Sequence, residues 1–436
     1  MTNPHKETAV NTDDHIALNE TCTVHATVDC PTCHDAQSDA VWNRTLAPRL
    51  NWFRLVGFAV VHLAIIGASL AWATARFAHH ASLRQLPELR DEPLRVEPQF
   101  DRPEMISDAQ LVAVLSKLKP RLAGPNPKIN HVDHALRFWG VEARFDDPEC
   151  LSGMQMRELL VDHRRFSDSW RRGTKPFLRR SAEGVTPLVQ RGPATSSHYD
   201  HTLASLAEVG TPLDYPLILP EGETTMRDML LYSLRKFSLN QQEYEWSALA
   251  FAHYLLPNDG WITTEGQHIT FDRIAERMMR EQLTDGVCFG NHRLHALTML
   301  LRVDEQNQIL SAEGRTAIVT HLRNVTDLLV TTQHESGCWD RNWDGIARED
   351  APGPMAPLSK KILATGHALE WWALAPEELH PPRDILVHAA DWLVREILKM
   401  SDSQVRTNYT FLSHAGRALT LWRGRFPAEV PLPSGL

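Results

Sequence analysis

One pattern recurs four times in the C-terminal half of this 436-residue chain and constrains its fold more than any other feature. An amphipathic stretch and a short polar turn precede an Ala- and Leu-rich stretch, which opens on two polar or aromatic residues three positions apart. Positions i and i+3 share one face of a helix, and helical hairpins repeated in this way form closed or curved arrays. The openings should therefore converge on one centre: Tyr244-Glu-Trp-Ser247, His292-Arg-Leu-His295, His367-Ala-Leu-Glu370 and His414-Ala-Gly-Arg417.

The region 107–436 is predicted to be an all-α domain. Its apolar residues repeat with helical period, and the breaks carry Gly, Pro, Asp and Asn. We expect an α/α toroid of repeated helical hairpins, with short β pieces near 215–219 and 268–270. The predicted helices are 108–119, 130–139, 153–169, 200–208, 225–237, 244–255, 272–283, 291–301, 315–333, 366–375, 383–400 and 411–422, the last eight pairing into four hairpins.

A charge-free stretch ahead of this domain predicts a single transmembrane helix at 51–76. Leu55 to Ala75 is 21 residues long and is bracketed by Arg54 and Arg76, which suits the thickness of a bilayer core. The long polar segment before it favours a retained anchor over a removed signal peptide, and a buried core helix is the alternative. Arginines are balanced across the span. The thiols of the N-terminal tail favour an N-terminus in the cytoplasm and a main domain outside it.

The acidic tail, residues 1–50, is too polar to fold by itself and is expected to be disordered. It holds a Cys/His cluster whose spacing suits a small zinc site. Two alternatives remain: a redox-sensitive or inert cluster, and covalent haem attachment, since Cys30-Pro-Thr-Cys33-His34 matches C-x-x-C-H. The four predicted zinc ligands are Cys22, His25, Cys30 and Cys33.

Prolines at intervals of five or six residues predict an extended stalk at 77–106 between the anchor and the helical domain. The formal net charge of the chain is −9 and its pI is about 6.2. Such a balance lacks the basic surface that binding to nucleic acid phosphates requires. The expected partners are therefore the lipid bilayer, through residues 55–75, and a small-molecule or glycan ligand, with no nucleic acid.

Two short motifs resemble known families of toroidal proteins. Leu329 to Trp339, with Gln333 and Trp339 in place, resembles the QW motif of the terpenoid cyclase and protein prenyltransferase superfamily, whose members are α/α toroids. That resemblance implies that Gln333 and Trp339 brace neighbouring hairpins. Gly366-His367-Ala-Leu-Glu370 is similar to the G-H-x-x-E motif of the N-acylglucosamine 2-epimerase family, (α/α)6 barrels that move a proton with histidines. The Asp-rich motif of the cyclases is absent from the chain.

Histidine acid/base chemistry on a carbohydrate-like or isoprenoid-like substrate is the first predicted function, because histidine titrates near neutral pH. The insertion Gly337 to Lys361 would form a lid rich in Trp and Asp. The candidate catalytic residues are His292, His367, Glu370 and Asp340, and the candidate substrate-binding residues are His295, Trp339, Asp344, Trp371 and His414.

Other interpretations of the same residues stay open. His292 and His295 at i and i+3 could chelate a metal ion, with His367 or His414 added from adjacent hairpins. His198-Tyr-Asp-His201 is a second metal-like cluster, or the start of a helix. Alternatively, the histidines only cap and pack their helices, and the protein is a membrane-tethered binding or scaffold protein. A distance within about 8 Å between the His292 and His367 imidazoles, across an open pocket, would favour the enzyme.

Overall fold

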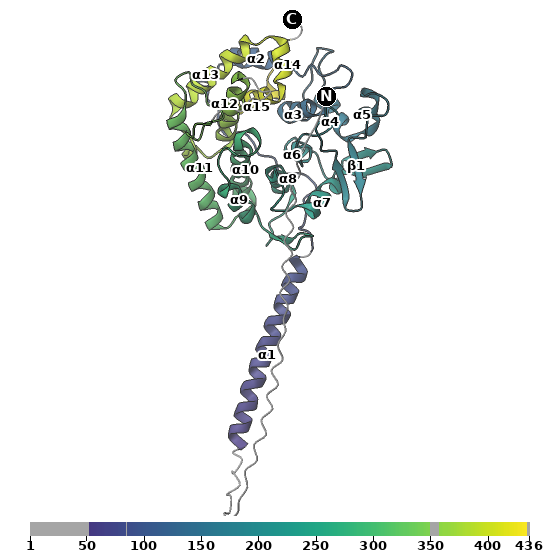
Figure 1. Ribbon diagram of the computed structural model, residues 1–436, viewed down its shortest axis with the longest axis vertical. Helices are drawn as coiled ribbons and strands as arrows, with labels where there is room; N and C mark the ends of the chain where they lie inside the picture. Colours follow the sequence, from purple (N-terminus) through teal and green to yellow (C-terminus); the bar gives the residue numbers. More distant parts are fainter. Residues whose placement is uncertain (1–51, 84, 349–356, 434–436) are drawn as a thin grey trace, which may run out of the picture. The chain divides into compact units, whose positions relative to one another are not determined.

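The computed structural model describes residues 52–83, 85–348 and 357–433. The chain divides into two compact units, Met1–Ser69 and Leu70–Leu436. Helix α1 (Trp52–Leu83) crosses the boundary between them. All other described elements belong to the second unit, which is mainly helical as predicted (Figure 1).

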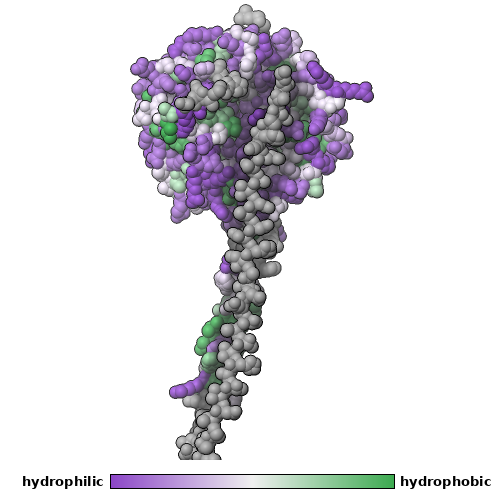
Figure 2. Space-filling model, in the orientation of Figure 1, coloured by the Kyte–Doolittle hydropathy of each residue, from purple (hydrophilic) through white to green (hydrophobic). Residues whose placement is uncertain are grey.

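Among the described residues, α1 holds the only helical stretch long and apolar enough to cross a membrane, Trp52–Arg76. Its apolar side chains are exposed, Phe53 by 90% and Leu63 by 67%. Figure 2 shows apolar residues along this helix, whereas the visible face of the helical unit is mainly hydrophilic. The one histidine in the span, His62, bonds through Nδ1 to the Phe58 carbonyl oxygen at 2.8 Å, so this polar group is satisfied within the helix.

The segment predicted as an extended stalk differs from the prediction in two ways: it begins as a helix, and its extended part pairs with the helical unit. Helix α1 continues to Leu83, beyond the predicted boundary at residue 76. The following Pro-rich residues are extended as expected, but they pair with the end of a helix: the Arg90 and Leu94 amides donate to the Tyr254 and His253 carbonyls, each at 2.8 Å. Apolar residues interspersed among the prolines explain the difference, since they supply surface to bury; Met105 and Ile106 are buried.

Six helices of the second unit are buried along most of their length and contact one another in a closed succession. They contain many Ala and small polar residues, which allow close packing on all sides. Each contacts the next, and the last contacts the first. In the order of contact they are α3 (Ile129–Trp139), α6 (His201–Glu208), α8 (Tyr244–Tyr254), α10 (Asn291–Asn307), α12 (Pro357–Leu374) and α15 (Tyr409–Leu421).

Most of the other helices of the second unit are amphipathic and pack against this inner set with one face (Figure 1). A Ser or Thr side chain caps several of them; the capping box of Ser107 and Gln110 at the start of α2 is one case. These helices are α2 (Asp108–Lys117), α4 (Gly153–Val161), α5 (His163–Ser169), α7 (Met226–Lys236), α9 (Phe271–Arg280), α11 (Ala312–Thr332), α13 (Arg383–Lys399) and α14 (Asp402–Thr407). Helix α5 instead packs against α4 and β3 (Pro216–Leu219).

The described residues also form three small antiparallel β-hairpins. The pair β3 (Pro216–Leu219) and β4 (Gly222–Thr225) includes the β piece predicted near 215–219, and β5 (Trp261–Ile262) with β6 (His268–Ile269) includes the one predicted near 268–270. The hairpin β1 (Leu178–Ser181) and β2 (Gly184–Pro187) was not predicted.

Several predicted helix boundaries are wrong: α10 ends at Asn307 and not at residue 301, and α14 was not predicted. The single helix expected at 153–169 is broken at Asp162, which bridges to Ile218 and whose side chain caps α5. Helix α12 begins at Pro357, nine residues before the expected start, so the last part of the predicted insertion is helical. Residues 349–356 of that insertion lie outside the described residues.

Candidate active site

A layer of imidazoles lies where the inner helices meet. It contains one histidine from each of five inner helices, and every one of them is buried. The ring centroids of His292 and His367 are 5.0 Å apart, and those of His367 and His414 are 3.8 Å apart. His134 stacks on His201 at 4.3 Å and meets His414 edge-on at 5.5 Å. The histidine layer is defined here as His134, His201, His292, His367 and His414.

Several nitrogens of this layer have no hydrogen-bond partner among the described residues, although they are fully buried. Both ring nitrogens of His292 are in this state, as are Nε2 of His367, of His414 and of His201. Burial also lowers the pKa of His292, His367 and His414, so these rings are neutral at pH 7 and keep one lone pair each. Buried polar atoms without partners are rare because they are costly, and they call for a ligand.

A second layer, one helical turn further along, consists of fully paired charges. Arg137 bonds to both Glu208 and Glu370, and Arg417 reaches the same two carboxylates at 3.1 and 2.6 Å. Burial alone would raise the pKa of Glu208 and Glu370, but Arg137 beside them holds it well below its usual range. We call these four residues the charge layer; its two positive and two negative charges balance.

His295 belongs to the charge layer rather than to the histidine layer. Its Nε2 lies 2.8 Å from Arg137 Nη2 and 3.5 Å from Glu208 Oε1. Because arginine only donates, Nε2 of His295 must accept, and the longer contact to Glu208 is then no hydrogen bond. The pair His292 and His295 therefore does not chelate one ion, since the Nε2 lone pair of His295 is already used.

Glu370 connects the two layers through His414. Its Oε2 lies 2.7 Å from Nδ1 of His414 and 3.4 Å from Nδ1 of His367. A carboxylate only accepts, so Nδ1 of His414 carries the proton and Nε2 is left with a free lone pair. Arg137 Nη1 also approaches Nδ1 of His414 at 3.3 Å, but two donors do not bond. Glu370 thus orients His414.

Cys288 joins the imidazoles from a strained segment just before α10. Cys288 and Phe289 adopt left-handed φ values of 51° and 56°, which non-glycine residues seldom do. A sulfur of Cys288 and one nitrogen each of His292 and His367 all lie within 4.8 Å of one another. A second group with the same spacing is formed by His367, Glu370 and His414. Thiolate and imidazole are the ligands that zinc prefers.

Two glycines allow α15 to pack closely against its neighbours. A Cβ on Gly366 would lie 3.1 Å from the backbone of Ala415, so glycine lets α12 and α15 touch next to His367 and His414, whose ring centroids are 3.8 Å apart. A Cβ on Gly416 would lie 2.5 Å from the Phe138 ring, so glycine at this position lets α15 approach α3.

The solvent side of the histidine layer lies at the N-terminal ends of α6 and α10. His198, in the loop before α6, and Cys288 are partly exposed, unlike the five rings of the layer. The His198 ring lies 6.1 Å from that of His292, and its Nδ1 lies 3.0 Å from Glu243 Oε2.

The other predicted site residues lie in loops or in the core. Asp340 Oδ2 lies 3.1 Å from His334 Nε2, and Asp344 pairs with Arg348 at 2.6 Å. Both carboxylates therefore bond to residues of the same loop and stabilise its conformation. Trp339 and Trp371 are completely buried in the core, where the Trp339 indole donates to the Leu329 carbonyl at 2.8 Å. This geometry gives no support to a catalytic Asp340 or to substrate binding by Trp339, Asp344 and Trp371.

The four predicted zinc ligands of the tail, Cys22, His25, Cys30 and Cys33, lie outside the described residues. Of the four predicted openings, that of α8 does not direct its first residue to the centre. The Tyr244 hydroxyl bonds to Glu281 at 3.2 Å, and Trp246 instead packs 4.6 Å from His292.

Four participants were missed by sequence reasoning. His134-Ala-Leu-Arg137 repeats the i, i+3 pattern of the later helices, so the same signal identifies it once the N-terminal half is searched. Glu208 and the placement of Cys288 have no such signal, because their roles depend on partners far away in the sequence. Comparisons with protein families, curated proteins and solved structures find no match to this chain.

Proposed function

We propose that this chain is a membrane-anchored enzyme of α/α-toroid architecture that binds one zinc-like divalent cation at its centre. Cys288, His292 and His367 are the proposed ligands. The observation that carries the proposal is the set of buried, neutral imidazole nitrogens without partners next to a thiol. Three protein ligands leave a fourth position for water, as in catalytic rather than structural zinc sites.

The histidine acid/base chemistry predicted from the sequence then falls to His414 and Glu370. A cation held by Cys288, His292 and His367 would lower the pKa of a bound water. Nε2 of His414 would serve as a proton acceptor, because Nδ1 of this ring donates its proton in the hydrogen bond to Glu370. Glu370 would also stabilise the imidazolium, as the carboxylate of a catalytic triad does. The proposed reaction class is therefore hydrolysis or proton transfer at a polarised carbonyl or phosphoryl group.

The toroid is supported by the closed order of contacts among α3, α6, α8, α10, α12 and α15. The resemblance to the QW motif agrees with a bracing role, since Gln333 donates to the Ile385 carbonyl of α13 at 2.9 Å. A carbohydrate-like or isoprenoid-like substrate remains our proposal from the two family resemblances. The alternative is a scaffold in which the imidazoles only pack.

The proposed anchor is α1, because its exposed apolar side chains have no other described surface to cover. We propose an N-terminus in the cytoplasm and a helical unit outside it. Resistance of the full chain to alkaline extraction from membranes tests the anchor. Protection of Cys30 and Cys33 from an impermeant thiol reagent in sealed cells tests the orientation.

Metal analysis of the purified full chain tests the central site. We expect the Cys288→Ser and His292→Gln variants to lose one equivalent of metal relative to the wild type. Cys150→Ser, a buried thiol remote from the layer, is the matched control and should lose none. A Cys30→Ser/Cys33→Ser variant reports separately on the tail. Equal metal content in the wild type and both site variants would favour the scaffold.

A further inference from the structure

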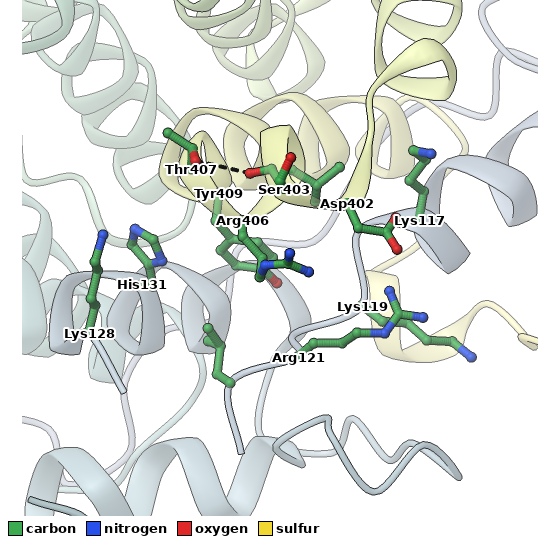
Figure 3. A pocket seen from close by; sticks show the side chains of 12 residues that line it. Lys117, Lys119, Arg121, Lys128, His131, Asp402, Ser403, Arg406, Thr407 and Tyr409 are labelled. Atoms are coloured by element: carbon green, nitrogen blue, oxygen red, sulfur yellow. Dashed lines mark hydrogen bonds between the residues drawn. The ribbon is translucent and has the colours of Figure 1, made fainter. Parts of the chain in front are cut away.

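A cationic cavity of about 340 Å³ lies between the end of α2, the start of α3, and α14 with the start of α15. Figure 3 shows its basic side chains approaching from these three segments. Five cationic side chains and one carboxylate, that of Asp402, line it. The cations are Lys117, Lys119, Arg121, Lys128 and Arg406.

Most of these cations have no counterion within the part of the chain that the structure describes. Arg121 pairs with Asp147 at 3.0 Å. Lys117, Lys119, Lys128 and Arg406 have no ion-pair partner among the described residues, and Lys117 and Lys119 are half-buried. Like charges gathered in one concavity repel one another, and the net charge of the chain is −9. An anion in the cavity would relieve this repulsion.

The wall of the cavity is fixed and partly apolar. The Tyr409 hydroxyl donates to the Leu118 carbonyl at 3.1 Å and accepts from the Trp139 indole at 3.2 Å. Its aromatic ring therefore has a set position beside Leu122 and Val405, which also line the cavity. Burial and the neighbouring Lys128 lower the pKa of His131 to about 4, so this ring is neutral at pH 7 and offers a hydrogen bond instead of a charge.

The geometry points to a binding site for a phosphate monoester or diphosphate group attached to a small organic body. A carboxylate ligand would bring only one negative charge to four unpaired cations. A phosphate brings up to two charges and three or more acceptor oxygens, and so matches them better. The N-terminus of α3, an 11-residue helix, adds the partial positive charge of its dipole. The volume falls within the range of small-molecule sites.

This site lies at the same ends of α3 and α15 as the histidine layer. His131 is one turn before His134, and Tyr409 is five residues before His414. The binding itself does not depend on the metal, since none of the three proposed metal ligands lines this cavity.

Calorimetric titration of the full chain in a maltoside detergent, with inorganic pyrophosphate as the probe, tests the inference. The Lys117→Gln/Arg406→Gln variant should bind pyrophosphate at least tenfold more weakly than the wild type. Arg172→Gln/Lys175→Gln removes two exposed charges elsewhere and should bind like the wild type. Binding that persists in Cys288→Ser separates this site from the proposed metal.

A second arm distinguishes the source of the phosphate. Dihexanoyl phosphatidic acid is titrated beside dihexanoyl phosphatidylcholine. Binding of pyrophosphate assigns the site to a soluble phosphorylated ligand, and binding of the phosphatidic acid alone assigns it to a lipid headgroup. Either result supports a phosphate site if the Lys117→Gln/Arg406→Gln variant loses the binding of that probe. Binding of neither probe, or undiminished binding in the cavity variant, overturns the inference.

Discussion

The histidine layer and the charge layer are neighbours on the inner helices, yet they differ in whether their buried polar atoms have hydrogen-bond partners. Every charge of Arg137, Glu208, Glu370 and Arg417 is paired within the protein. One turn away, neither ring nitrogen of His292 has a hydrogen-bond partner in the part of the chain that the structure describes. The paired layer has its partners inside the chain and is suited to holding the helices together. The histidine layer keeps ring nitrogens without a partner among the described residues, which is why we assign function to it.

The largest expected effect comes from breaking the charge layer. Arg137→Leu leaves Glu208 and Glu370 with less compensation in a buried environment, and breaking such a pair costs about 3–5 kcal/mol. Thermal or denaturant unfolding of the full chain measures it. Arg164→Leu, which breaks the exposed pair with Asp162, is the control and should change stability by less than about 1 kcal/mol. Similar effects of the two variants would contradict a structural role for the layer.

A smaller effect is expected from the close contact between α15 and α3 at Gly416. Gly416→Ala places a Cβ against Phe138 and Leu118 and should destabilise the protein by about 1–3 kcal/mol through overpacking. Gly124→Ala, at a position with open space, is the matched control. Unchanged unfolding of Gly416→Ala would mean that α3 and α15 pack less closely than described.

Acid should destabilise the two layers in succession. The histidines have folded-state pKa values below their ordinary value of 6.5, so the unfolded chain binds more protons, and stability falls as the pH drops below about 6.5. The pKa values of Glu208 and Glu370 are lowered as well, so these two carboxylates reduce the stability further only when the pH falls below their ordinary pKa of 4.5. In metal-free protein, His367→Gln should reduce the slope of stability against pH below about pH 6.5, because the lowered pKa of His367 contributes to that slope. An unchanged slope would show that His367 is protonated in the folded state.

The smallest effect on stability is expected within the histidine layer. His292→Gln removes a neutral ring without hydrogen bonds, so metal-free protein should lose less than about 1 kcal/mol. The same variant should abolish metal binding at the centre. Unfolding with and without chelator measures both quantities. A loss as large as that of Arg137→Leu would place His292 among the structural residues and remove the contrast between the layers.

The sequence predicted what local periodicity controls. The i, i+3 openings identify His292, His367 and His414 as residues of inner helices, and these three do meet. The predicted start of α12 was wrong because we interpreted a Pro-rich stretch as a loop. Proline is in fact well tolerated in the first turn of a helix, and α12 begins at Pro357.

Contacts distant in sequence were beyond prediction. The break at Asp162 depends on Ile218, and the charge of Glu208 is balanced by Arg137 and Arg417. The left-handed backbone at Cys288 has no local signal either, since nothing in its residue type favours that conformation. These positions are set by tertiary packing, and they complete the candidate site.

Cobalt(II) substitution of the full chain tests the central claim most directly, because thiolate and imidazole ligands give a tetrahedral cobalt ion an intense visible spectrum. The account predicts a thiolate-to-cobalt charge-transfer band that persists in the Cys30→Ser/Cys33→Ser variant. The band should disappear in Cys288→Ser, and visible absorption should weaken in His292→Gln. A spectrum that is unchanged by Cys288→Ser, or that is absent whenever Cys30 and Cys33 are replaced, would contradict a metal site at the centre of the helical unit.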